Sequence, residues 1–142
     1  MLRVVLDANL LTSAVLTPLG EARALLRRAR VDYELLLSDF MHARLAQVLH
    51  YPHIQTKYPH LTSGVITEYL ALLRGLALFV PEKTETTASK DPEDNRVLAV
   101  AVDGQADYLV TRNHSHFPAT YGQIKIVSPA DFRSHLQGAQ DR

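Results

Sequence analysis

The chain has 142 residues, of which 46% are hydrophobic and 21% are charged, and its formal net charge at pH 7 is zero. This length suits one ordinary domain, and the composition is that of a globular protein, which excludes the disordered and fibrous classes. The balanced charge predicts no general attraction to nucleic acid, so RNA binding depends on a local basic patch. The densest basic cluster, formed by Arg23, Arg27, Arg28 and Arg30, has the spacing of a solvated helix face.

The sequence contains no cysteine, which excludes disulfides, thiolate metal ligands and thiol nucleophiles. Its longest apolar runs are too short to span a bilayer, and the first apolar run stops at Asp7, well short of a signal-peptide core. We therefore expect a cytoplasmic protein without membrane contact. Its chemistry must rely on carboxylates, histidines or hydroxyls.

The chain alternates short apolar runs with segments of helical spacing. Leu2 to Leu6 is rich in valine, which is typical of a strand buried on both faces of a parallel sheet. In the first half we further predict a helix from about Leu19 to Arg30, a strand at Tyr33 to Leu37, a helix at Phe40 to His50 capped by Ser38 or Asp39, and a surface connector at Tyr51 to His60.

The second half continues the same alternation. We predict a helix capped by Thr62 or Ser63 that runs to about Leu76, a short strand at Leu78 to Val80, and a polar loop at Glu82 to Lys90. A helix then runs from Asp91-Pro92 to about Val102. Strands at Tyr108 to Thr111 and Ile124 to Val127 and a last helix to about Gln137 complete the chain. This order predicts an α/β fold with a mainly parallel central sheet, in a single domain spanning 1–142.

Polar side chains stand where predicted strands end or helices begin. In a parallel sheet, ligands bind beyond the carboxyl ends of the strands. Such positions are held by Asp7, Asn9, Ser38, Asp39, the Asp91 to Asn95 turn and Asn113. Carboxylates gathered at one edge repel each other unless a divalent cation neutralises them, and hard oxygen ligands favour Mg²⁺ or Mn²⁺.

Each acid also has a structural interpretation. Asp7 can cap the following helix, although an unpaired charge at the end of a buried strand favours a functional role. Asp94 suits the positive end of a helix, and Asp91 before Pro92 is foremost an N-cap. His114 and His116 lie beside Asn113, where they either contact substrate phosphate or are ordinary surface residues.

The sequence resembles the PIN-domain family, in particular the toxin components of VapBC-like toxin–antitoxin systems. Four segments carry the likeness: Val4 to Asn9, Ser38 to Leu49, Asp91 to Asn95 with Ala101 downstream, and Ala106 to Asn113. The resemblance implies a three-layer α/β/α domain, a Mg²⁺- or Mn²⁺-dependent endoribonuclease acting on RNA, a small antitoxin partner and a homodimer. It assigns Asp7 and Asp94 as metal ligands, Asn113 as their catalytic neighbour, and Thr111 and Arg112 as supporting or phosphate contacts.

Two positions depart from the family pattern. Arg44 stands where the family usually has a glutamate, and His116 stands where relatives with an asparagine at position 113 often have an acid. Two alternatives follow for the charge at this site. In one, Arg44 pairs with Asp7 or Asp94 and takes the place of the ion. In the other, Asp39 or Asp91 reaches inward and partly restores the acidic cluster. The sequence thus predicts a ribonuclease weakened by an incomplete site. The alternative is a non-catalytic PIN-like module that binds RNA or protein.

Overall fold

The computed structural model describes residues 1–140, so the last two residues of the domain predicted over 1–142 lie outside the described part. The strands are β1 Leu2–Leu6, β2 Tyr33–Leu37, β3 Leu78–Phe79, β4 Tyr108–Val110, β5 Thr120–Tyr121 and β6 Ile124–Val127. The helices are α1 Ala8–Leu16, α2 Glu21–Leu26, α3 Asp39–Leu49, α4 Pro52–Lys57, α5 Ser63–Leu76, α6 Pro92–Asp103 and α7 Pro129–Gln140, with a 3₁₀ turn, η1, at His114–His116.

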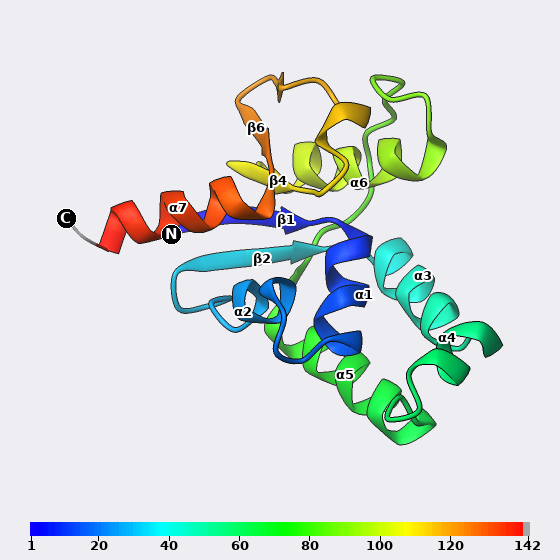
Figure 1. Ribbon diagram of the computed structural model, residues 1–142. Coiled ribbons are helices and arrows are strands. Elements are labelled where there is room, and N and C mark those ends of the chain that lie inside the picture. Colours follow the sequence, from blue (N-terminus) through cyan, green and yellow to red (C-terminus); the bar gives the residue numbers. More distant parts are fainter. Residues whose placement is uncertain (141–142) are drawn as a thin grey trace.

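The strands form one six-stranded sheet in the order β3-β2-β1-β4-β6-β5. All neighbours are parallel except β5 and β6, which are antiparallel. The chain leaves β1 toward β2 on one side and later adds β4 on the other, so the strand order reverses between β1 and β4 (Figure 1). The predicted mainly parallel α/β fold is therefore confirmed, and the reversal point is where such sheets bind ligands.

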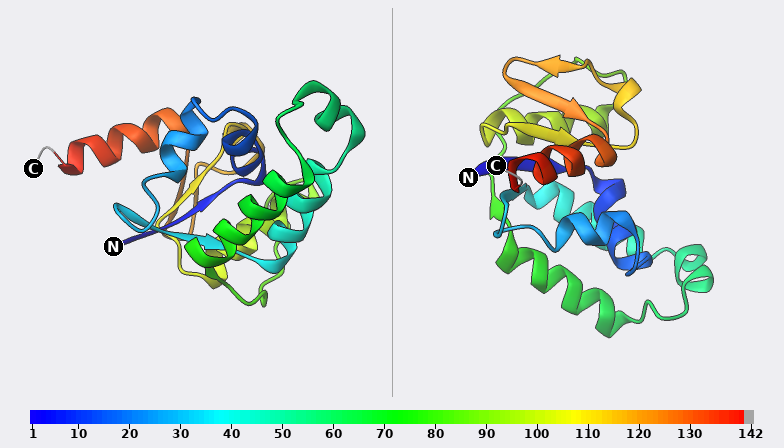
Figure 2. Two further views of the ribbon diagram at one scale, coloured as in Figure 1. Left: turned by 90° about the horizontal axis from the view of Figure 1, so that it is seen from below. Right: turned by 60° about the vertical axis from the view of Figure 1, so that its left-hand side comes forward.

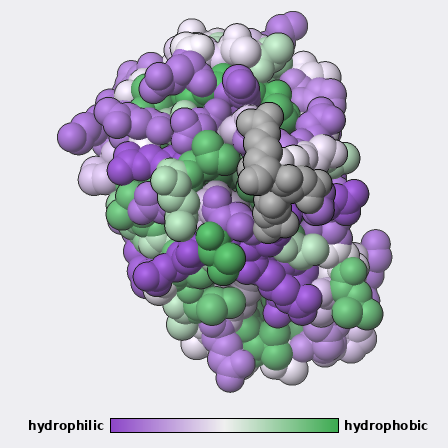
Figure 3. Space-filling model, turned by 90° about the vertical axis from the view of Figure 1, so that its left-hand side faces the viewer, coloured by the Kyte–Doolittle hydropathy of each residue, from purple (hydrophilic) through white to green (hydrophobic). Residues whose placement is uncertain are grey.

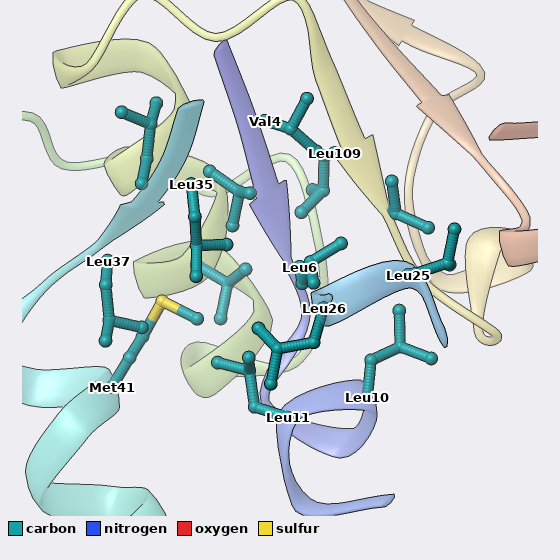
Figure 4. Packing of buried hydrophobic residues seen from close by; sticks show 14 of the residues in the cluster. Val4, Leu6, Leu10, Leu11, Leu25, Leu26, Leu35, Leu37, Met41 and Leu109 are labelled. Atoms are coloured by element: carbon teal, nitrogen blue, oxygen red, sulfur yellow. The ribbon is translucent and has the colours of Figure 1, made fainter. Parts of the chain in front are cut away.

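Helices cover both faces of the sheet (Figures 1 and 2). Successive strand residues point to opposite faces, and the register places Val4 beside Leu35 on one of them. That face packs on α1, α2 and α3 through buried residues such as Leu11, Leu26 and Met41 (Figure 4). On the opposite face α6 covers the sheet, and the result is an α/β/α arrangement of three layers.

The hydrophobic residues visible on the side that carries both chain ends form small groups separated by hydrophilic ones (Figure 3). Within residues 1–140 no helix combines the length and apolar character needed to cross a bilayer.

Two helices lie outside the predicted elements. Asp7 caps α1, a helix without predicted bounds whose Leu10, Leu11, Ala14 and Val15 are buried at helical spacing. The predicted surface connector from Tyr51 to His60 contains the short helix α4, which Pro52 opens. The helix predicted from Leu19 to Arg30 is wrong in length, since α2 covers only Glu21–Leu26.

The polar segment from Glu82 to Lys90 is a loop, as predicted, but both its ends are fixed. The Asp103 carboxylate accepts hydrogen bonds from the backbone N–H groups of Lys83 (2.7 Å) and Thr84 (3.0 Å). At the other end, Asn95 binds the backbone of Ser89 twice, once as acceptor and once as donor, at 2.8 Å each. These bonds hold the loop against α6 and position its last residues beside the acidic site.

Candidate acidic site

A cavity of about 160 Å³ lies beyond the ends of β1 and β4, between the N-terminal turns of α3 and α6. It occupies the place where the strand order reverses. The lining includes most residues that the sequence analysis had placed at this edge; they are Asp7, Asn9, Arg44, Asp91, Asp94, Asn113 and His116, together with Ala8, Phe40, Met41, Glu93 and Val97.

Asp7 both caps α1 and lines the cavity, and these are the two roles between which the sequence did not decide. One carboxylate oxygen caps α1 by accepting the backbone N–H of Ala8 at 2.7 Å. The other accepts the hydroxyl of Thr111 at 2.8 Å, and Thr111 is itself fully buried after β4. Asp7 is 5% exposed, and its two partners fix the carboxylate at the cavity. Capping and lining the cavity are therefore compatible roles.

Asp94 lies in the first turn of α6, with its side chain 17% exposed. Its Oδ2 atom is buried, and no hydrogen-bond donor reaches it from the described residues. The ring nitrogen Nδ1 of His116 is 3.9 Å away from this atom, beyond hydrogen-bond distance. A buried carboxylate oxygen without a donor is costly, so this atom is suited to a cation or a ligand donor.

Burial and neighbouring acids raise the cost of ionising both Asp7 and Asp94. Burial is the main cause that raises the pKa of Asp7, and the charges of Asp91 and Glu93 add to it, while the Thr111 and Ala8 hydrogen bonds oppose it. Burial also raises the pKa of Asp94, followed by the charges of Asp91 and Asp7. A cation bound to both carboxylates would stabilise their ionised forms against burial and against the charges of the neighbouring acids.

Arg44 lines the cavity but does not pair with Asp7 or Asp94, so that part of the sequence interpretation is wrong. Its Nε lies 3.0 Å from Oε1 of Glu93. Its Nη1 donates to the Tyr51 hydroxyl at 2.8 Å and to Gln47 Oε1 at 2.9 Å. The reason is geometric: α3 presents Arg44 toward α4 and the outer side of α6, where Glu93 lies. The guanidinium thus forms a basic wall of the cavity and leaves the two inner acids unpaired by it.

Three other candidates lie elsewhere. Asp39 does not reach inward, because its exposed carboxylate pairs with Arg74 of α5 at 2.8 Å. Ser38 is buried and caps α3 by accepting the Met41 N–H at 3.2 Å. Arg112 is exposed and donates to the hydroxyl of Ser13 at 2.9 Å rather than lining the cavity.

Asp91, Asn9 and Asn113 lie at the mouth of the cavity with exposed side chains. Asp91 is the N-cap of α6, as predicted, and accepts the Glu93 N–H at 2.8 Å. Glu93 is a lining residue that the sequence analysis did not single out. Its place in the first helical turn is common for solvated acids, and only its pairing with Arg44 reveals its position.

The family profile for the PIN domain matches residues 3–115. The chain belongs to the PIN domain family. None of the curated protein sequences compared with it matches.

Solved structures share the fold of this PIN domain at low sequence identity. One is VapBC2 from Rickettsia felis bound to a promoter DNA fragment, with 11% identity, a TM-score of 0.61, and coverage of 89% of this chain and 98% of that chain. Another is FitAcB from Neisseria gonorrhoeae, with 19% identity, a TM-score of 0.60 and the same coverage. A structure of FitAB bound to a DNA fragment has 16% identity and a TM-score of 0.51, and covers 89% and 94% of the two chains. At these identities the likeness concerns the fold.

The acidic cavity of the PIN domain fits a divalent cation with a sparse set of protein ligands. Within residues 1–140, no three acidic or histidine side chains converge closely enough to enclose an ion by themselves. The buried Oδ2 of Asp94 nevertheless lacks a donor, and the carboxylate of Asp7 lines the same cavity. Mg²⁺ commonly binds through one or two carboxylates and completes its shell with water and substrate phosphate. The donor set is compatible with that kind of site.

Proposed function

We propose that this PIN domain is a Mg²⁺- or Mn²⁺-dependent endoribonuclease and the toxin component of a toxin–antitoxin system, with catalysis weakened by its sparse acidic site. The observation that carries the proposal is the buried Oδ2 of Asp94, which has no donor among the described residues and belongs to a side chain that lines the same cavity as Asp7. The resemblance to VapBC-like toxins supplies the substrate class and the reaction.

In this proposal Asp7 and Asp94 hold the ion, and when bound it supplies electrostatic stabilisation for phosphodiester hydrolysis by water. Thr111 acts as a positioning residue, because its hydroxyl fixes one oxygen of Asp7. Asn113 and His116 stand at the mouth of the cavity, where an amide and an imidazole can donate hydrogen bonds to a phosphate oxygen. Arg44 lies on the opposite wall as a second phosphate contact.

Cleavage of single-stranded RNA in Mn²⁺ buffer tests the proposal. The purified wild type is expected to cut, and Asp7→Asn and Asp94→Asn are expected to lose cutting, because each removes one of two charged ligands. Asp39→Asn is the matched control, since Asp39 is an acid in the same region that pairs with Arg74 outside the cavity. Equal cutting by all four proteins would identify a contaminating nuclease and defeat the proposal.

A non-catalytic module is the second candidate, and Arg44 favours it. A cation in the cavity wall lowers the affinity for a metal ion while it raises the affinity for a phosphate. The same assay separates the two functions when RNA binding is measured beside cleavage. Binding of RNA by the wild type without cleavage at any Mn²⁺ concentration would support the module, whereas loss of cleavage in both asparagine variants would support the nuclease.

We further propose that the protein acts in the cytoplasm as a homodimer and is inhibited by a small antitoxin that covers the acidic cavity. The basis is the resemblance to VapBC-like toxins, together with the similar fold of the VapBC2 and FitAcB structures. If a small protein is encoded next to its gene, co-expression of the two is expected to give a stable complex that does not cleave RNA, and the lack of any such reading frame would contradict the toxin interpretation. A monomer in light scattering at micromolar concentration would contradict the dimer.

A further inference from the structure

A second and larger cavity, of about 640 Å³, opens beside the acidic one. The two share Asp91, Asp94 and His116 as a common wall. Pockets for small organic ligands measure roughly 300–1,000 Å³. The larger cavity therefore has room for a nucleotide, whereas the acidic cavity, at about 160 Å³, suits an ion with a phosphate oxygen. The rest of the larger cavity is lined by Ala88, Ser89, Lys90, Ser115, Phe117 and Pro118.

The side chains of this cavity match the parts of a nucleotide. The side chain of His116 is 60% exposed and lines both cavities, so its ring offers a surface for stacking, whereas Phe117 is buried and adds an apolar part to the lining. The hydroxyls of Ser89 and Ser115 can form hydrogen bonds with the edge of a base, and the ammonium group of Lys90 can neutralise a phosphate. Proteins recognise single-stranded RNA by this combination of ring stacking, edge hydrogen bonds and backbone charge.

We propose that this cavity, here called the base pocket, binds one unpaired base of the RNA strand, next to the phosphate at the acidic site. The inference rests on the proposed ribonuclease function and adds to it a separate subsite for one base, in the cavity next to the acidic one. A base within a duplex cannot enter a pocket beside the phosphate without being unpaired and turned out of the stack.

Both walls of the base pocket are held by hydrogen bonds. On one side Asn95 fixes the backbone of Ser89, and the Ser89 hydroxyl accepts the Asp91 N–H at 3.3 Å. On the other side η1 is closed by the N–H of His116, which donates to the Asn113 carbonyl at 2.9 Å. A pocket with walls fixed in advance orders fewer groups on binding, which favours affinity for a flexible strand.

Binding of a fluorescently labelled single-stranded oligoribonucleotide, measured by anisotropy in EDTA so that divalent metal cannot support cleavage, tests the proposal. The decisive variant is Ala88→Phe, because Ala88 lines the base pocket and not the acidic cavity, and a phenyl group there fills the space for a base. We expect binding weaker by on the order of tenfold for Ala88→Phe and for His116→Ala, the effect of losing one stacked base. A duplex of the same sequence is expected to bind weakly to every variant.

Matched controls lie in the same segments. Ala88→Ser keeps the pocket open, and His114→Ala removes the other imidazole of η1, which lines neither cavity. Both are expected to bind as the wild type does. Calorimetric titration of Mn²⁺ is expected to give the same affinity for Ala88→Phe and the wild type, which shows that the acidic site is intact.

Unchanged oligonucleotide binding in Ala88→Phe and His116→Ala would overturn the base pocket, as would equal affinity of the wild type for single-stranded and duplex RNA. If those results accompanied cleavage that Asp7→Asn abolishes, the ribonuclease function would stand and only the base pocket would fall. If Asp7→Asn had no effect on cleavage while Ala88→Phe weakened binding, the pocket would remain as the binding site of a non-catalytic module.

Discussion

The hydroxyl of Thr111 joins the ends of β1 and β4 at the acidic site, and its removal gives a measurable test of the site geometry. It donates to Oδ2 of Asp7 at 2.8 Å and accepts the backbone N–H of Asn113 at 3.0 Å. The side chain is fully buried. Thr111→Val replaces this hydroxyl with a methyl group of similar size, so both hydrogen bonds are lost without an appreciable cavity.

The expected loss of stability follows from the two bonds. A hydrogen bond to a charged group contributes about 1.5–3 kcal/mol and a neutral one about 0.5–1.5 kcal/mol, so the variant should lose roughly 2–4.5 kcal/mol of unfolding free energy. Unfolding entropy is about 2.1 cal/mol/K per residue, which for 142 residues is about 0.3 kcal/mol/K. Thr111→Val should therefore lower Tm by about 7–15 °C.

The loss should depend on pH. Burial raises the pKa of Asp7 above its ordinary value, and the Thr111 hydrogen bond opposes that shift because it stabilises the ionised carboxylate. Stability from this bond is present above the raised pKa of Asp7, where the carboxylate is charged, and is lost as the pH falls through that pKa. The difference in stability between wild type and Thr111→Val should thus be larger above that pKa than in acid.

Guanidinium unfolding followed by circular dichroism at neutral and acidic pH measures both effects. Thr111→Ser keeps the hydroxyl and loses only the methyl group, so its loss of stability should not depend on pH. Thr56→Val is the surface control, because the exposed Thr56 hydroxyl donates to a neutral group, the Pro52 carbonyl of α4. The same loss for Thr111→Val at both pH values, or none at neutral pH, would refute a hydrogen bond to a charged Asp7.

Four further predictions follow from the same structure. Asp7→Asn should be more stable than the wild type at neutral pH, since a buried acid with a raised pKa destabilises the fold once ionised; the gain should vanish in thermal melts below the ordinary pKa of the carboxyl group. Arg44→Glu should bind Mn²⁺ on the order of tenfold more tightly in calorimetry, because a cation in the cavity wall becomes an acid. Arg74→Glu is its control and should bind Mn²⁺ as the wild type does, because it changes only the exposed pair with Asp39. Tyr69→Phe should cost roughly 1–2 kcal/mol in urea unfolding, because its buried hydroxyl donates to the Leu11 carbonyl at 2.6 Å and ties α5 to α1. Gly104→Ala should lower Tm, because its Cβ would lie 2.7 Å from Leu36 Cδ1 and 3.0 Å from Val80 Cγ2; an unchanged Tm would mean that the end of α6 moves freely away from the sheet.

The fold class, and the edge of the sheet at which polar residues gather, follow from the amino-acid sequence alone. Short valine- and leucine-rich runs are typical of buried strands, and helix caps such as Ser38, Thr62 and Asp91 mark the helices between them. Once the strands are parallel, residues that follow them in the chain share one edge. Asp7 and Asn113 therefore line one cavity with Asp94, as local pattern and sheet topology together imply.

The tertiary structure decided which of these side chains face one another. Arg44 and Asp39 lie on the same helix, yet Arg44 turns to Glu93 at the cavity and Asp39 turns to Arg74 outside it. Their partners come from α6 and α5, which are distant in sequence, so the helical period alone could not assign them. The base pocket likewise depends on Asn95 fixing a loop whose composition indicated only irregular structure. Such contacts arise from the packing of whole elements, because the rotation of a helix about its axis is set by the residues that it buries.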